Sequence, residues 1–260
     1  MQATQFGTFF ELGGNAAIEA LSRTGLDYVI IDTEHGRFSV ESTAEYIIAA
    51  ERNQMPAYVR IGDISRHSVL RMLDIGAKGL IVPNIRSVEE VKKLVSYAKF
   101  PPIGNRGYCP NRTSGWGADE WASDTLAYMQ TCNKECKLIP QCETTNALEK
   151  IEEIASLDGV DGIFVGPCDL SIAMGIPLQF NHPDLHAAIK KILTACKQHK
   201  KESYIFAGNM NDAVMWAEAG FDSITYSLDA SVFLQAYRNI VAKFREIGRA
   251  SCRERVFYKV

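Results

Sequence analysis

The sequence predicts a single α/β barrel of eight parallel strands, and three observations lead to that fold class. The chain has 260 residues, and about 250 residues is typical of such a barrel. Short apolar segments alternate with longer segments in which apolar residues recur every three or four positions, as strands alternate with amphipathic helices. Several helical segments close on a glycine just before the next apolar segment, as in TGLDY, IGAKG, DGVDG and AGFDS, and glycine commonly ends helices.

The expected strands are short and apolar, as buried parallel strands are. In chain order they are GTFFEL, YVIID, AYVRI, GLIVP, KLIPQC, GIFVG, SYIFAG and SITYS. The expected helices cover residues 15–25, 39–53, 65–79, 87–100, 146–159, 184–200, 209–220 and 229–247. A doubly wound open sheet is the competing architecture, but it would need a glycine-rich nucleotide loop, and the sequence contains no G-x-G-x-x-G.

The composition argues against several classes of function. A net charge of −3 provides no basic field for nucleic acid or an anionic membrane. The sequence opens without a leader pattern, and its apolar runs are far shorter than the roughly 20 residues that span a bilayer. Seven cysteines without a CxxC pair favour reduced thiols over a zinc site at Cys132 and Cys136. A cytoplasmic protein with a small-molecule substrate is expected.

Two segments depart from the alternating pattern. Residues 101–124 are rich in Pro, Gly, Asn and Trp; loops of this length are usually functional or disordered, and the aromatic content argues against disorder. We expect a flap over the site or a subunit contact. Residues 1–248 are expected to form one domain. The basic tail 249–260 lacks clear periodicity and is treated as a cloning or read-through remnant, or an unusual native tail.

Polar residues follow the expected strands at their carboxyl ends, where α/β barrels place their active sites. Because all parallel strands end on the same rim, these side chains are expected to gather there. They are Asp32, Glu34 and His35 after the second strand, Arg60 at the end of the third, Gln141 and Glu143 after the fifth, and Asp169 after the sixth.

Glu143 and Asp169 come from adjacent strands, so they could converge on one cation. Two carboxylates, water and a chelating substrate suit Mg²⁺ or Mn²⁺. A solvated pair is the alternative, and Asp169 could instead cap the helix that opens at DLS. The backbone N–H groups of Cys168 and Asp169, at the start of that helix, offer a site for a carboxylate or phosphate.

His35, Arg60 and Asp74 are candidates for catalysis, each with a simpler alternative. A histidine can act as a general base near neutral pH, although a lone histidine is more often structural. Arg60 ends an apolar strand and needs an anionic partner or a substrate oxygen. Asp74 lies late in a helix, where the dipole disfavours a carboxylate, so it is either partnered, with His35 a candidate, or a surface residue. Lys78 and Lys137 precede their strands, which disfavours a Schiff-base mechanism.

Five segments occur in a distinctive order: DYVIIDTEHG, VRIGD, LDIGAKGLIVPNIRSVEEV, PPIGNRG and QCETTNALEKIEEIASLDGVDGIFVGPCDLSIAMG. The set resembles the class II pyruvate aldolases of the HpcH/HpaI family, from about Gly7 to about Leu234. The resemblance implies a TIM (β/α)₈ barrel of the phosphoenolpyruvate/pyruvate superfamily, with the last helix swapped between subunits of a homo-oligomer, a hexamer or trimer of dimers. It also implies reversible cleavage of a 4-hydroxy-2-oxoacid of the 2-keto-3-deoxy acid type into pyruvate and an aldehyde, through a metal-stabilised pyruvate enolate.

The resemblance further implies a role for each matching residue. Those roles are a divalent metal (Mg²⁺, Mn²⁺ or Co²⁺) at Glu143 and Asp169, catalysis by His35, Arg60 and Asp74, substrate binding by Arg60, Gln141, Cys168 and Asp169, and support by Asp32 and Glu34. A citrate lyase β or malyl-CoA lyase-like acyl-CoA lyase is the alternative, which the EHG element argues against, and a regulatory barrel is a second. The aldehyde is not identified. Arg106 and Arg112 in the insertion are candidates to bind a distal carboxylate, although loop arginines are more often solvated or in subunit contacts.

Overall fold

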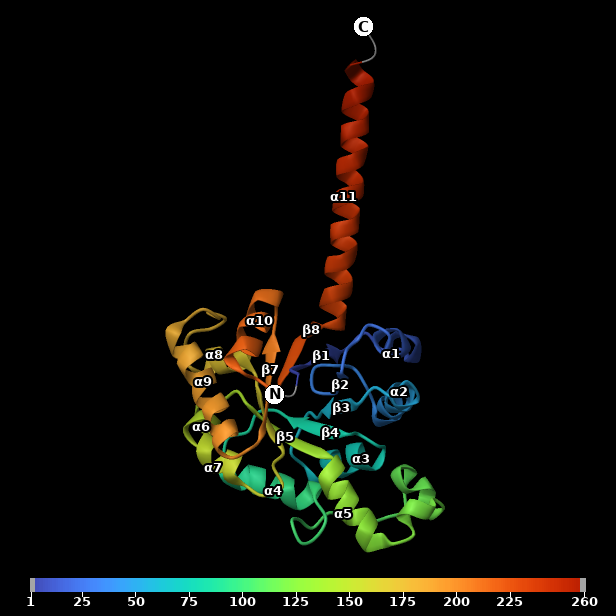
Figure 1. Cartoon of the computed structure of the whole chain (residues 1–260), viewed down its shortest axis with the longest axis vertical. Coiled ribbons are helices and arrows are strands. Elements are labelled where there is room, and N and C mark those ends of the chain that lie inside the picture. The colour runs from blue at the N-terminus through green and yellow to red at the C-terminus, as the bar shows by residue number, and fades with distance from the viewer. Residues whose placement is uncertain (1–2, 258–260) are drawn as a thin grey trace.

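The computed structural model describes residues 3–257 and shows a closed barrel of eight parallel strands (Figure 1). Each strand hydrogen-bonds to the next one in the sequence, and β8 pairs with β1 to complete the ring. Every apolar segment predicted to be a strand overlaps one, so the TIM-barrel fold class is confirmed. The strands are β1 (Gln5–Phe10), β2 (Tyr28–Asp32), β3 (Ala57–Arg60), β4 (Gly79–Val82), β5 (Lys137–Cys142), β6 (Gly162–Val165), β7 (Glu202–Ala207) and β8 (Ser223–Leu228).

Helices surround the barrel, and their starting points follow the sequence. Ser39, Ser65 and Ser87 each cap a helix by accepting the N–H of the third residue that follows, which satisfies a backbone donor with no partner inside the helix. The helices are α1 (Asn15–Leu21), α2 (Val40–Arg52), α3 (Arg66–Asp74), α4 (Val88–Ala98), α5 (Thr125–Glu135), α6 (Thr145–Glu149), α7 (Ile151–Ser156), α8 (Pro167–Ala173), α9 (Pro183–Gln198), α10 (Met210–Ala219) and α11 (Asp229–Phe257). None of those described is long and apolar enough to cross a membrane.

Aromatic side chains fill the interior of the barrel below its carboxyl-end rim. Tyr28, Tyr58 and Tyr204 are buried together, with ring centroids 5.3–6.3 Å apart. At the amino-terminal end of the interior, the Lys137 ammonium donates to Glu202 Oε1 at 2.8 Å. We call these five residues the barrel floor. Lys137 opens β5, so the prediction that it lies at the opposite end from the rim is confirmed.

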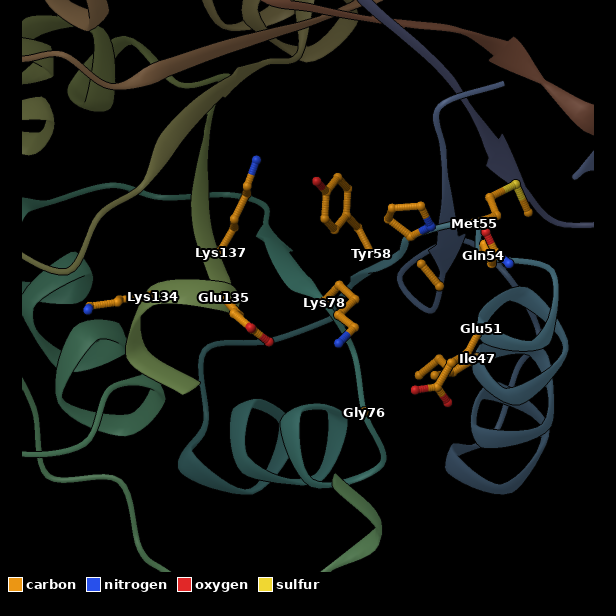
Figure 2. Close-up of a pocket in the computed structure, with 12 residues that line it drawn as sticks. Ile47, Glu51, Gln54, Met55, Tyr58, Gly76, Lys78, Lys134, Glu135 and Lys137 are labelled. Atoms are coloured by element: carbon orange, nitrogen blue, oxygen red, sulfur yellow. The ribbon is translucent and has the colours of Figure 1, made fainter. Parts of the chain in front are cut away.

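A pocket of about 470 Å³ adjoins the barrel floor, and its lining includes Lys78, Lys134 and Lys137. Figure 2 shows that the three ammonium groups point in different directions, with that of Lys137 directed away from the other two. The three cations therefore do not converge on one anion.

The last helix leaves the barrel rather than packing against it (Figure 1). Along α11, Phe233, Tyr237, Ile240, Phe244 and Ile247 are exposed to between 56% and 76%. Apolar side chains of this size are unusual on the surface of a monomer when they form a continuous stripe. The helix predicted to end at residue 247 continues to Phe257, and residues 258–260 of the predicted tail lie outside the described residues.

The insertion at residues 101–124 contains two short 3₁₀ helices, η1 (Arg112–Gly117) and η2 (Glu120–Ala122). It follows α4, whose end faces the amino ends of the strands, so it lies at the opposite end of the barrel from the rim. Arg112 forms an ion pair with Glu51 at the end of α2. The prediction of a flap over the site is therefore wrong within one chain, whereas a subunit contact stays a prediction.

Candidate active site

A cavity of about 390 Å³ opens at the carboxyl-end rim of the barrel. It is lined by residues at or just after the ends of seven strands and by residues of α8. Five of them were predicted from the sequence: His35, Arg60, Gln141, Cys168 and Asp169. The rule that active sites lie at the carboxyl ends of the strands, called here the strand-end rule, thus identified side chains that are up to 134 positions apart in the chain and meet in one cavity.

Arg60 and Asp32 form a buried ion pair beside this cavity. They are register partners at the ends of β3 and β2. Arg60 Nε donates to Asp32 Oδ1 at 2.8 Å, and Nη2 donates to Oδ2 at 2.6 Å. Burial alone would raise the pKa of Asp32, but the hydrogen bonds and charge of Arg60 outweigh it and hold that pKa below its usual value. The prediction that Arg60 needs an anionic partner is confirmed, and Asp32 fixes the plane of its guanidinium.

Two further groups surround the guanidinium. Arg60 lies with its Cζ 4.5 Å from the centre of the Phe9 ring, a favourable cation–π arrangement. Its Nη1 is 3.3 Å from Glu34 Oε2. Burial raises the pKa of Glu34 although Arg60 acts in the opposite direction. The carboxylates of Asp32 and Glu34 therefore hold Arg60 from two sides.

His35 lies at the mouth of the cavity, and its side chain is 66% exposed. Its Nε2 is 3.8 Å from Glu34 Oε2. Glu34 is thus the neighbouring carboxylate that can orient the imidazole. A side chain in this position can exchange protons both with a ligand in the cavity and with solvent.

The predicted contact between Asp74 and His35 is not formed within one chain. Asp74 is the last residue of α3, and helices of an α/β barrel run antiparallel to its strands, so Asp74 lies at the end opposite His35. Its Oδ1 instead accepts from Arg106 Nη2 at 2.7 Å and from Asn111 Nδ2 at 3.1 Å. The prediction of a partner for this carboxylate was right, and the choice of His35 was wrong. Arg106 likewise binds Asp74 rather than a substrate in this chain.

Glu143 lies behind the cavity, directly after β5, and is 6% exposed. Its Oε1 accepts the backbone N–H of Asn84, and its Oε2 accepts from Gln141 Nε2. Burial raises the pKa of Glu143 to about 7, and the charges of Asp169 and Glu34 add to the rise. The predicted site thus contains a buried carboxyl group whose hydrogen-bond partners, a backbone N–H and an amide, carry no positive charge.

The oxygen donors at this side of the cavity fit a hard divalent cation. Asp169 lies in the first turn of α8 without a side-chain capping bond, so the capping alternative is not observed. Gln141 Oε1 is buried and has no hydrogen-bond partner. No group of three or more His, Cys, Asp or Glu side chains that could hold a metal occurs among the described residues. A cation at Glu143 and Asp169 would therefore take further ligands from water or substrate.

The cavity residues that were not predicted include Glu11, Phe206 and Leu228. Glu11 directly follows β1, so the strand-end rule would have found it had it been applied to the first strand. Its carboxyl group lies near that of Asp32, and burial together with the charge of Asp32 raises the pKa of Glu11. Phe206 and Leu228 lie in apolar strands, where sequence alone does not separate a cavity wall from packed core.

Comparisons with known proteins agree on one group. The family model described as HpcH/HpaI aldolase/citrate lyase matches residues 5–236. The chain is 34% identical to the hydroxypyruvate/pyruvate aldolase of Paraburkholderia phytofirmans, over 92% of this chain and 93% of that one. It is 30% identical to the 5-keto-4-deoxy-D-glucarate aldolase of an Enterobacter species, over 93% of both chains. The structure of an HpcH/HpaI aldolase/citrate lyase family protein from Burkholderia cenocepacia superposes with a TM-score of 0.86 at 32% identity, covering 94% of this chain and 95% of that one.

Proposed function

The chain belongs to the HpcH/HpaI aldolase/citrate lyase family and is a carbon–carbon lyase, and we propose that it reversibly cleaves a 4-hydroxy-2-oxoacid into pyruvate and an aldehyde. One observation supports this reaction over an aldol cleavage through a covalent imine. Arg60 and Asp169 line a cavity whose described lining contains no lysine, and the carboxyl group of Glu143 lies behind it. Such a site suits an enolate formed without a covalent imine.

Glu143 and Asp169 would hold the divalent cation, Mg²⁺, Mn²⁺ or Co²⁺. When bound, such a cation polarises carbonyl oxygens and stabilises negative charge on them. The unpartnered Oε1 of Gln141 lies on the same side of the cavity and can accept from a bound water. The N–H groups of Cys168 and Asp169 would bind the pyruvate carboxylate at the start of α8.

Cleavage requires a proton to leave the 4-hydroxyl group and a proton to reach C3 after the C3–C4 bond breaks. His35 would take the first proton, because it lies at the mouth of the cavity with Glu34 beside it. Arg60 would stabilise the oxygen on which negative charge develops at C2. Asp32 holds the guanidinium in a fixed plane through two hydrogen bonds, so little reorganisation is needed. Asp74 could take part only from a neighbouring subunit.

A substrate panel tests the proposed reaction. With Mg²⁺ or Mn²⁺ present, we expect pyruvate release from 4-hydroxy-2-oxoacids and none of the products of malyl-CoA or citryl-CoA cleavage. Borohydride added with pyruvate should leave the mass of the chain unchanged, because no lysine lines the cavity among the residues that the structure describes, and none could form an imine there. Acetyl-CoA release without pyruvate release would favour the acyl-CoA lyase, and a stable adduct would revive the imine mechanism.

We also propose that the chain is a homo-oligomer in the cytoplasm. The exposed stripe on α11 supports this, and so does an apolar groove of about 530 Å³ beside α1, lined by residues that include Leu12, Leu21 and Tyr226. A helix from a second copy would cover such a groove. The six described cysteines are free, as is usual in a reducing compartment.

Light scattering tests the assembly. The native protein should have several times the 28.9 kDa mass of one chain, and a double variant, Ile240→Asp with Phe244→Asp, should be smaller because charged groups cannot be buried without partners. Lys243→Glu, on the same helix, changes charge without removing an apolar contact and serves as the control. A native mass of one chain would contradict the proposal.

A further inference from the structure

Glu11 lies in the cavity but has no role in the proposed reaction. It follows β1, whereas Gln141, Glu143 and Asp169 follow β5 and β6. In a closed barrel with the strand order β1 to β8, β5 lies across the ring from β1. If the pyruvate half of the substrate binds at β5 and β6, Glu11 is on the side that the aldehyde half would reach.

Glu11 is held in place by its surroundings. Its backbone N–H donates to Asp229 Oδ1 at 2.9 Å, and the next N–H, that of Leu12, donates to Oδ2 at 3.1 Å. Its side chain lines the cavity, near the carboxylate of Asp32. The backbone at Glu11 is therefore anchored, and its side chain forms part of the cavity wall.

This side of the cavity is poor in positive charge. The described lining contains one arginine, Arg60, and one histidine, His35. The guanidinium already contacts Asp32 and Glu34. With Glu11, three carboxyl groups lie near one guanidinium, so the four groups carry a net negative charge even with one proton bound. Asp229, at the start of α11, adds a further carboxylate close to Glu11.

We propose that Glu11 makes the aldehyde side of the cavity selective for uncharged hydroxyaldehydes over aldehydes that carry a carboxylate. A carboxylate placed here would meet like charge without a free counter-ion, and such a placement is strongly unfavourable. A hydroxyl group would instead find an acceptor in Glu11, while Phe206 and Leu228 supply an apolar wall for the carbon chain. This inference rests on the proposed function and specifies its substrate class.

The experiment measures kcat/KM for addition of pyruvate to lactaldehyde and to succinic semialdehyde. The native enzyme should favour lactaldehyde by about tenfold or more, and Glu11→Gln should reduce that ratio by about tenfold, mainly through a lower KM for succinic semialdehyde. Raising the salt concentration should narrow the native ratio, because screening weakens repulsion between charges near solvent. Glu19→Gln, an exposed position on α1, should leave the ratio unchanged.

A second variant and a second readout separate the possible failures. Glu11→Asp keeps the charge and should keep the native preference, so an equal shift in both Glu11 variants would overturn the inference. Pyruvate methyl-proton exchange without aldehyde should be unchanged in Glu11→Gln. Native preference for succinic semialdehyde, or an unchanged ratio in Glu11→Gln with exchange intact, also overturns it. Absence of pyruvate exchange in the native enzyme would overturn the proposed function itself.

Discussion

Replacing Arg60 with alanine is expected to slow pyruvate methyl-proton exchange and oxoacid cleavage together, by about 10²–10³-fold, the usual cost of removing one donor to a developing oxyanion. Both reactions pass through the same enolate, so a group that stabilises it must affect both. Isotope exchange followed by NMR measures the first reaction, and coupled pyruvate release measures the second. Exchange at the native rate in a folded Arg60→Ala variant would remove Arg60 from this role.

The same substitution should also destabilise the fold. Removing one partner of a buried ion pair costs about 3–5 kcal/mol, and Asp32 would be left at 0% exposure without its cation. The double variant Arg60→Met with Asp32→Asn separates the two effects. It should regain much of the lost stability, measured by urea unfolding, without regaining exchange. Recovery of exchange in the double variant would show that Arg60 acts only through the fold.

Removal of divalent cations is expected to abolish activity, and Mg²⁺, Mn²⁺ or Co²⁺ should restore it. Glu143→Gln removes the charge of a predicted ligand but keeps its shape, so it should weaken Mn²⁺ binding by more than tenfold, measured by titration calorimetry. Glu153→Gln, on the exposed surface of α7, is the matched control. Full activity in EDTA would contradict the metal role.

The pH dependence of Mn²⁺ binding follows from Glu143. Burial raises its pKa to about 7, so below that pH a proton competes with the cation. Affinity should fall about tenfold for each pH unit below about 7 and be nearly constant above it. In the metal-free protein, the effect of Glu143 on the stability of the fold has the opposite dependence on pH: stability decreases as pH rises. The folded state holds a proton that the unfolded state releases near pH 4.5, so this contribution is lost as pH rises through about 7. Affinity that does not change between pH 6 and 8 would contradict this account.

The strands were predictable because buried parallel strands are nearly continuous apolar runs, and serine caps indicated where α2, α3 and α4 begin. Helix α5 was not predicted. It buries only Tyr128 and Asn133, so its sequence has no clear apolar stripe. The 146–159 segment was predicted as one helix and forms two, α6 and α7, divided at Lys150, whose backbone angles leave the helical range.

The strand-end rule identified most of the site because all parallel strands end on the same rim, whatever the detailed packing of the barrel interior. The contact of Asp74 with His35 and the placement of Arg106 and Arg112 near the substrate are not observed within one chain. All three residues lie in or after helices, at the amino-terminal end of the barrel, and charge alone does not indicate that position. The sequence indicates that a charged side chain in a buried or unfavourable position needs a partner. Only the three-dimensional structure shows that the partner of Asp74 is Arg106.

The barrel floor limits the routes by which ligands can enter and leave the cavity. Tyr28, Tyr58 and Tyr204 fill the interior beneath the cavity, and the pair Lys137–Glu202 lies at its amino-terminal end. A ligand can therefore enter and leave the cavity only through the carboxyl-end rim. Two ligands that share this single passage must pass in sequence, and the one seated deeper enters first and leaves last.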